Sequence, residues 1–109
     1  MVSDITIVKE RAQLAVLSLS EHVNITASFL FGSHVNGTND KYSDIDVGAF
    51  VEDYNDLDLD EEVKISVQIQ KKVGFDIELH FFNASDLTNA EPASFASYVI
   101  KNGIPLSIT

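Results

Sequence analysis

Apolar residues near the start of the chain recur at steps of three and four positions. Between positions 5 and 23 they are Ile5, Val8, Ala12, Val16, Leu19 and Val23. Residues at this spacing lie on one side of a helix, so the sequence predicts an amphipathic helix over 5–23. Ser3 or Asp4 can cap its first turn, because a side-chain oxygen there accepts a hydrogen bond from a free backbone N–H.

Three short segments have the composition of strands. Segment 25–31 is an apolar run that ends at Gly32, which predicts a buried strand. Residues 32–41 include two Gly, two Asn, one Ser and one Thr, a composition typical of a loop or the start of a helix, and segment 44–51 then returns to strand character. In segment 75–82 apolar and polar residues alternate at first, and this predicts a third strand.

The segment 63–73 fits both a strand and a helix. Its apolar residues alternate with polar ones from Val63 to Ile69, as in a strand, but they also form a broad helical face. The acids before it and Lys71 and Lys72 at its end suit a helix dipole, and Gly74 is a natural stop, so a helix is predicted. Residues 52–62, with seven acids in eleven positions, are expected to form a solvated loop.

The last part of the chain predicts a short helix over 95–101, which Gly103 closes, and an edge strand over 106–108. The order helix, strand, strand, helix, strand, helix is typical of an α/β (α+β) domain with a small mixed sheet flanked by helices. Because the chain has no internal repeat, low-complexity tract or linker, residues 1–109 are expected to form a single domain.

Composition narrows the kinds of function. The sequence has no cysteine, so disulfides and thiolate metal sites are excluded. A formal net charge of −10 repels nucleic acid, and general DNA or RNA binding is therefore not expected. No apolar run approaches the roughly 20 residues needed to cross a bilayer, and residues 1–10 lack the apolar stretch of a signal peptide. A cytoplasmic protein without a membrane segment is expected.

The segment 32–46 carries the candidate chemistry. Gly32 and Ser33 follow a predicted buried strand, where a bare backbone and free N–H groups favour a phosphate. Ten residues separate Ser33 from Asp44, and Asp46 follows two positions later, so on a strand both carboxylates project from one face. Two such carboxylates repel each other unless a cation joins them, and Mg²⁺ prefers carboxylates together with substrate phosphates. With that metal the pair can orient the α-phosphate of a nucleoside triphosphate as pyrophosphate leaves.

A third acid is expected on a neighbouring strand. Asp76 and Glu78 share one face of the predicted strand 75–82, and such an acid can complete a metal site or remove the proton from an attacking hydroxyl. His80, on the same face, is interpreted as a packed or hydrogen-bonded residue rather than a ligand. Four aromatic residues are interpreted as core rather than as a surface for base stacking: Phe81, Phe82, Phe95 and Tyr98.

With these residues the chain resembles the minimal nucleotidyltransferases of the polymerase β-like superfamily. Their signature is a hydrophobic residue, then Gly-Gly or Gly-Ser, then Asp-x-Asp about ten residues later, and it is closely matched by LFGSHVNGTNDKYSDIDV, which begins at Leu30. Segments 77–82 and 100–104 are also similar to one small free-standing branch of the superfamily. The resemblance implies the polymerase β-like fold over the whole chain and transfer of a nucleoside monophosphate, AMP from ATP, to a hydroxyl.

The resemblance also implies which residues bind the nucleotide. It makes Gly32 and Ser33 the triphosphate-binding turn, and the full nucleotide-binding set is Gly32, Ser33, Lys41 and Ser43. Many relatives carry Arg residues just after the Gly-Ser pair, whereas this chain has His34 and Asn36 there. Lys41 is then the only cation of the loop, which predicts weak binding of triphosphate.

The metal ligands follow from the same resemblance. It makes Asp44, Asp46 and Glu78 the ligands of a two-metal Mg²⁺ site, with Mn²⁺ as the alternative ion. The match of Ile-Glu-x-His favours Glu78 as the third acid, while the more usual Asp of the superfamily can align with Asp76. Glu78 is ranked slightly ahead, and both remain candidate catalytic residues.

Two functions compete on this basis. In the first, the chain is an enzyme whose acceptor is presented by a second chain, because 109 residues leave no room for a substrate domain. A self-dimer or a HEPN-type helical protein is expected there, since relatives of this size often act as antitoxins that nucleotidylate such a toxin. In the second, the chain is a catalytically weak or inactive binding module that neutralises its partner by contact. The missing loop arginines favour the second function, and the intact Gly-Ser and Asp-x-Asp favour the first.

Overall fold

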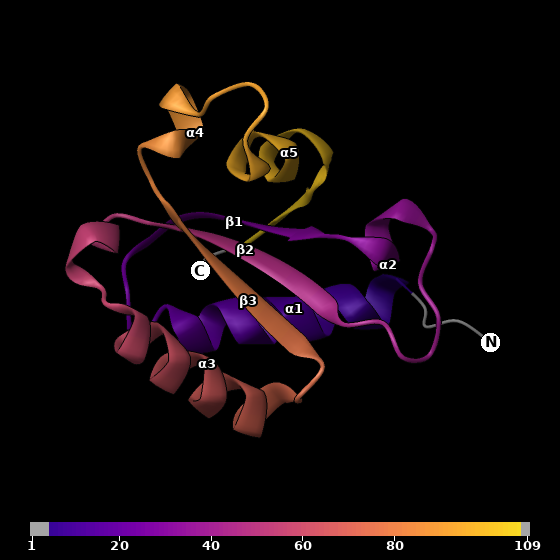
Figure 1. Cartoon of the computed structure of the whole chain (residues 1–109). Helices are drawn as coiled ribbons and strands as arrows, with labels where there is room; N and C mark the ends of the chain where they lie inside the picture. Colours follow the sequence, from indigo (N-terminus) through magenta and orange to yellow (C-terminus); the bar gives the residue numbers. More distant parts are fainter. Residues whose placement is uncertain (1–4, 108–109) are drawn as a thin grey trace.

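The computed structural model describes residues 5–107. Its helices and strands, labelled in Figure 1, are α1 (Ile5–Leu19), β1 (Ile25–Phe31), α2 (Ser33–Asn36), β2 (Ile45–Val51), α3 (Leu59–Val73), β3 (Ile77–Asn83), α4 (Asp86–Asn89), α5 (Phe95–Asn102) and β4 (Ile104–Leu106). A 3-10 turn, η1 (Tyr54–Asp56), lies between β2 and α3. Over these residues no helix has both the length and the apolar character needed to cross a membrane.

The strands form a mixed sheet in the order β3-β2-β1-β4. Strand β1 pairs antiparallel with β2 and with β4, while β2 pairs parallel with β3. Helix α3 lies between β2 and β3 in the sequence and supplies the long crossover that a parallel pair requires. The predicted α/β class, with a small mixed sheet flanked by helices, is confirmed.

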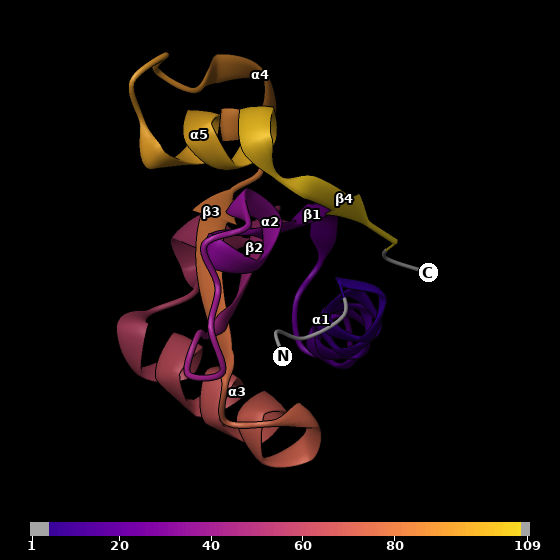
Figure 2. The same ribbon diagram turned by 90° about the vertical axis from the view of Figure 1, so that its right-hand side faces the viewer.

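Helices cover both faces of this sheet. Figure 1 shows α1 and α3 below the strands and α4 and α5 above them, and the turned view in Figure 2 keeps the same layers. The larger core lies between the sheet and the helices α1 and α3, and its fully buried members include Val16, Leu19, Val47 and Ile69. A smaller core packs α5 on the other face, and its buried members are Phe31, Phe50, Ala96 and Val99.

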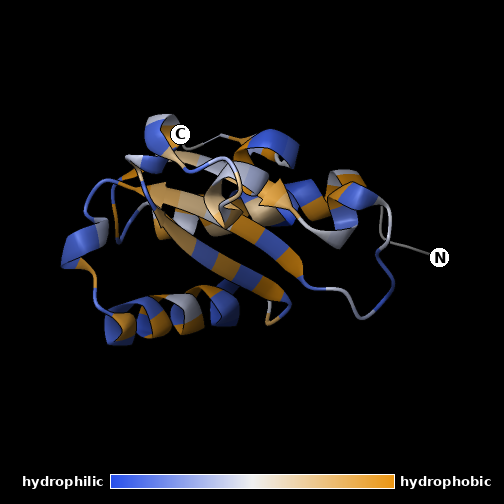
Figure 3. Ribbon diagram, turned by 45° about the horizontal axis from the view of Figure 1, so that its top comes forward, coloured by the Kyte–Doolittle hydropathy of each residue, from blue (hydrophilic) through white to orange (hydrophobic). Residues whose placement is uncertain are grey.

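Alternate residues of β2 face these two cores, as the pleat of a strand requires. Ile45 and Val47 belong to the larger core, whereas Phe50 belongs to the smaller one. Asp46 is an even number of positions from Phe50, so it faces the side that α5 covers. The banding of hydrophobic and hydrophilic residues along the strands and along α3 is visible in Figure 3.

Several element bounds differ from the prediction. Helix α1 ends at Leu19 instead of position 23, and β2 and β3 begin at Ile45 and Ile77 instead of 44 and 75. Strand β4 ends at Leu106, where the prediction had it begin. Within 32–41, predicted as a loop or the start of a helix, α2 begins at Ser33, whereas the sequence pattern did not predict α4. The predicted cap at positions 3 or 4, and position 108 of the predicted edge strand, lie outside the described residues.

The helix predicted over 63–73 begins four residues earlier, at Leu59. Asp58 Oδ1 accepts a hydrogen bond from the Glu61 backbone N–H at 2.8 Å, and the Glu61 carboxylate accepts one from the Asp58 N–H at 3.4 Å. This capping box satisfies backbone donors that the start of a helix leaves free. The acids from 59 to 62 therefore belong to the helix, and the prediction of a solvated loop over 52–62 was wrong for them.

We expect Asp58→Ala to lower the free energy of unfolding by about 1 kcal/mol, because the substitution removes the side-chain acceptor at the start of α3. Asp56→Ala is the matched control, since it removes the same charge from η1, just outside the capping box. Urea denaturation of both variants and of the wild type measures the difference. Equal stability of the two variants would contradict the capping role.

Candidate active site

The parallel pairing of β2 with β3 brings candidate acids together. Its register aligns Asp46 with Glu78, and His80 follows two positions later on β3. Aligned residues on neighbouring strands point to the same face of a sheet, so these side chains share the face that α5 covers. Strand β1 contributes Phe31 opposite Asp46, and the candidate phosphate-binding turn begins at the next residue, Gly32.

Asp46, Glu78 and His80 form a compact group of candidate metal ligands. One ligand atom from each lies within 4.8 Å of the other two. His80 Nε2 is 3.1 Å from Asp46 Oδ1 and 3.9 Å from Glu78 Oε1. An ionised carboxylate only accepts hydrogen bonds, so Nε2 is the donor to Asp46. The side chains of Asp46 and His80 are 21% and 23% exposed, and the group is therefore partly accessible to solvent.

The Glu78 carboxylate lies near other negatively charged carboxylates. The pKa of Glu78 is raised, chiefly because its carboxyl is partly removed from water and further because the carboxylates of Asp46 and Asp44 lie nearby, while His80 acts in the opposite direction. Asp44 directly precedes β2 and is exposed. A divalent cation would relieve the repulsion between these carboxylates, and carboxylate oxygens are the donors that Mg²⁺ or Mn²⁺ prefers.

Gly32 joins the predicted phosphate-binding turn to these acids. Its φ is 89°, a region that other residues rarely adopt, and a Cβ at this position would overlap the Asp46 carboxylate. Helix α2 begins at the next residue, Ser33, and its first turn closes when the N–H groups of Val35 and Asn36 bond to the Gly32 carbonyl. The turn and the carboxylate therefore lie in direct contact, as a site that binds phosphate beside a metal needs.

The two other residues predicted to bind nucleotide lie in the loop between α2 and β2. The Lys41 ammonium is 5.1 Å from the centre of the Tyr42 ring. The Ser43 hydroxyl accepts a hydrogen bond from the Asp40 backbone N–H at 2.9 Å, and the Ser43 carbonyl oxygen lies 3.4 Å from His34 Nε2. These contacts shape the loop, and neither side chain belongs to the group of candidate metal ligands.

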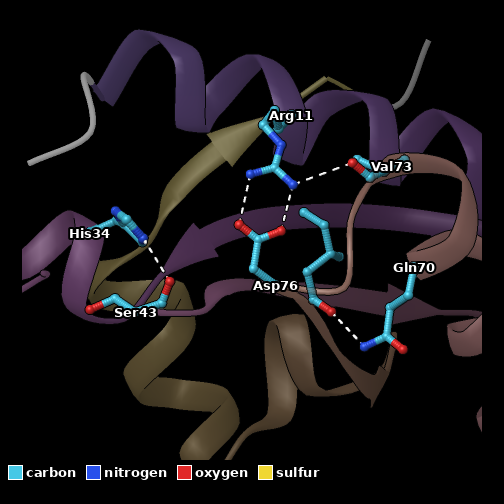
Figure 4. A network of polar contacts seen from close by, with 7 residues as sticks. Arg11, His34, Ser43, Gln70, Val73 and Asp76 are labelled. Atoms are coloured by element: carbon cyan, nitrogen blue, oxygen red, sulfur yellow. Dashed lines mark hydrogen bonds and ion pairs between the residues drawn. The ribbon is translucent and has the colours of Figure 1, made fainter. Parts of the chain in front are cut away.

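Asp76, the alternative third acid, lies apart from that group. Figure 4 shows its carboxylate bonded twice to Arg11 of α1, at 2.5 and 2.7 Å, and Arg11 also donates to the Val73 carbonyl at 3.3 Å. The hydrogen bonds from Arg11 hold the pKa of Asp76 below its usual value, so its charge is already paired. Asp76 precedes β3, and the alternation of the strand does not reach it. Asp76 therefore does not share a face of the strand with Glu78, and the sequence prediction that the two acids share one face was wrong.

Two contacts near these acids were not found from the sequence. Arg11 is the sole arginine of the chain, which was a usable signal, but its partner lies 65 positions away. The bond from His80 to Asp46 spans 34 positions. The alternation that put His80 on the face of Glu78 could have indicated it, and the interpretation of His80 as a hydrogen-bonded residue agrees with the structure.

Comparison with known proteins gives a family match over most of the chain. The model of the family named Polymerase beta, Nucleotidyltransferase matches residues 16–107. That range includes the Gly32–Ser33 turn, both acids of the Asp-x-Asp motif and Glu78, and it covers the whole mixed sheet. Among curated proteins, no sequence matches the chain.

Substitutions of Asp76 and of Glu78 should differ in their effects on stability and on Mn²⁺ binding. Asp76→Asn leaves Arg11 without its charged partner, and we expect a loss of about 1 kcal/mol in stability, a modest value because both side chains are partly exposed. Glu78→Gln removes a repelled charge, so stability should be unchanged or higher while Mn²⁺ affinity falls by about tenfold. Thermal denaturation and isothermal titration with Mn²⁺ measure the two effects. If Mn²⁺ binding were weakened in Asp76→Asn but not in Glu78→Gln, Asp76 rather than Glu78 would be the metal ligand.

Gly32→Ala tests the contact between the turn and Asp46. The added methyl displaces that carboxylate, so we expect weaker Mn²⁺ binding together with a loss of about 1 kcal/mol in stability from backbone strain. Gly37→Ala is the control, since Gly37 also has a positive φ, 78° in the left-handed helical region, while its methyl meets nothing within 4 Å. Isothermal titration of both variants separates the effects, and equal Mn²⁺ affinities would argue against the contact.

Proposed function

The chain belongs to the polymerase β nucleotidyltransferase family, and we propose that it transfers a nucleoside monophosphate, AMP from ATP, to a hydroxyl group in a reaction that depends on a divalent metal. The observation that carries the proposal is the contact of Gly32 with Asp46, which lies beside Glu78. A tight turn with a bare backbone at Gly32 and a cluster of acids then meet at one point, and a triphosphate with its metal ion needs both.

Asp44, Asp46 and Glu78 would hold Mg²⁺, or Mn²⁺ in its place, and the metal would neutralise charge on the phosphates as pyrophosphate leaves. His80 orients Asp46 by donating to Oδ1. Ser33 adds its backbone N–H and its hydroxyl to the side of the site where the β- and γ-phosphates bind. Lys41 and Ser43, on the loop between α2 and β2, are proposed as further contacts to the nucleotide.

In the proposed reaction the oxygen of an acceptor hydroxyl attacks the α-phosphorus. The bond from that phosphorus to the oxygen bridging to the β-phosphate breaks, and pyrophosphate leaves with the electron pair. The hydroxyl proton passes to a carboxylate oxygen of Glu78, which the strand register places beside Asp46. Asp76 has no part in this step, because Arg11 occupies its carboxylate.

The acceptor is proposed to lie on another protein chain. A surface with a net charge of −10 disfavours nucleic acid as the acceptor. We propose a hydroxyl of a HEPN-type helical toxin, with this chain as its antitoxin, and a second copy of the chain as the alternative acceptor. Either partner would approach the face that carries Asp46 and Glu78, on which the attacking oxygen must enter.

A second function is supported by one feature of the loop. Lys41 is the only cation between Gly32 and Asp44 in the sequence, and its ammonium lies over Tyr42. A triphosphate would therefore meet little positive charge from the protein itself. On this reading the chain retains the fold as a weakly active or inactive module, and it acts on its partner by contact.

Titration of ATP into the protein tests the proposal. We expect binding that requires Mg²⁺, that chelation of the metal abolishes, and that the double variant Asp44→Asn/Asp46→Asn loses. Asp56→Asn/Asp60→Asn removes the same charge from exposed positions away from the cluster and should bind ATP like the wild type. Transfer of label from the α-phosphate of ATP to a hydroxyl of the co-purified partner would establish the reaction.

Two other outcomes would count against the enzyme proposal. A folded wild-type protein that binds none of the four nucleoside triphosphates in the presence of Mg²⁺ would overturn the enzyme proposal. Partner binding that persists in the double variant Asp44→Asn/Asp46→Asn, without transfer of label, would support the binding module.

A further inference from the structure

Two aromatic side chains of α5 are exposed beside the acids. Phe95 is 51% exposed and Tyr98 is 40% exposed, and their rings stack with centroids 6.5 Å apart. The sequence interpretation of these two residues as core was wrong, because α5 turns Ala96 and Val99 inward instead. Phe81 and Phe82, by contrast, are packed against the two cores, as expected.

Ring contacts connect Phe95 to the acid cluster. The Phe95 ring centroid is 5.6 Å from that of His80 and 5.5 Å from that of Phe31, with the rings edge to face in both pairs. His80 in turn donates to Asp46, and Phe31 directly precedes Gly32. Phe95 therefore lies one side chain away from both the metal-binding acids and the phosphate-binding turn.

Tyr98 contacts the short helix that follows the Gly32–Ser33 turn. Its hydroxyl accepts a hydrogen bond from Asn36 Nδ2 at 3.2 Å. Asn36 is the last residue of α2, the short helix that begins at Ser33. The stacked pair thus extends from the acid cluster to the far end of the helix that follows the phosphate-binding turn.

We propose that Phe95 and Tyr98 form the surface on which the base of the nucleotide stacks; this inference rests on the function proposed above. A base is separated from its α-phosphate by a single ribose, and a single side chain, His80, lies between Phe95 and Asp46. Aromatic rings bind bases through their π faces, and an uncharged patch is where an acidic protein can receive the base. A purine covers more of the two rings than a pyrimidine does, so the site takes a purine nucleoside triphosphate.

The test compares ATP with inorganic tripolyphosphate, both titrated with Mg²⁺ into wild type and variants. Tripolyphosphate keeps the phosphate and metal contacts but has no base. We expect Phe95→Ala to weaken ATP binding about tenfold and to leave tripolyphosphate binding unchanged. Phe95→Trp keeps a π face and should bind ATP at least as well as the wild type. Leu59→Ala is the control, since it truncates a side chain that is 73% exposed on α3, across the sheet.

A second measurement needs no variant and so does not depend on the folding of Phe95→Ala. The wild type should bind ATP and GTP several-fold more tightly than CTP and UTP. Equal binding of ATP by wild type and a folded Phe95→Ala, or equal affinity for all four triphosphates, would overturn the assignment while the proposed function stands. Wild type that binds neither ATP nor tripolyphosphate would overturn both.

Discussion

The register between β2 and β3 is the constraint on which the rest of the site depends. It aligns Asp46 with Glu78, so two negative charges occupy neighbouring positions on one face of the sheet. Like charges placed in this way destabilise a sheet. The opposite face keeps the register, because Ile45 and Ile77 are aligned one position earlier and both are fully buried. A slip of one strand by one residue would bury an acid in the larger core and expose an isoleucine.

Local patterns were sufficient for the fold class but not for the details of the site. Strand and helix periodicities, together with Gly32 and the Asp-x-Asp spacing, predicted the order of the longer helices and strands and placed Asp46 and Glu78 on strands of the sheet. They could not separate Asp76 from Glu78, since two acids spaced by two positions look alike in a strand pattern. The difference comes from Arg11, which is far away in the sequence and adjacent only once α1 packs on the sheet.

Two other misjudgements have physical causes of a different kind. The capping box of Asp58 and Glu61 was present in the local sequence, but the density of acids around it favoured the interpretation as a loop. For Phe95 and Tyr98 of α5, the error came from the assumption that aromatic residues are buried in the core. This helix has eight residues and presents only a narrow stripe to the sheet, so small residues fill that stripe and the large ring of Phe95 remains outside.

The pair formed by Arg11 and Asp76 has a consequence for how such chains diverge. The Asp76 carbonyl accepts a hydrogen bond from the Ile45 N–H at 2.7 Å, so the segment that Arg11 holds is also the one where β2 and β3 first meet. A substitution at position 11 should therefore be tolerated best when position 76 is also substituted. Among related sequences we expect these two positions to covary, whereas Glu78 should vary independently of position 11.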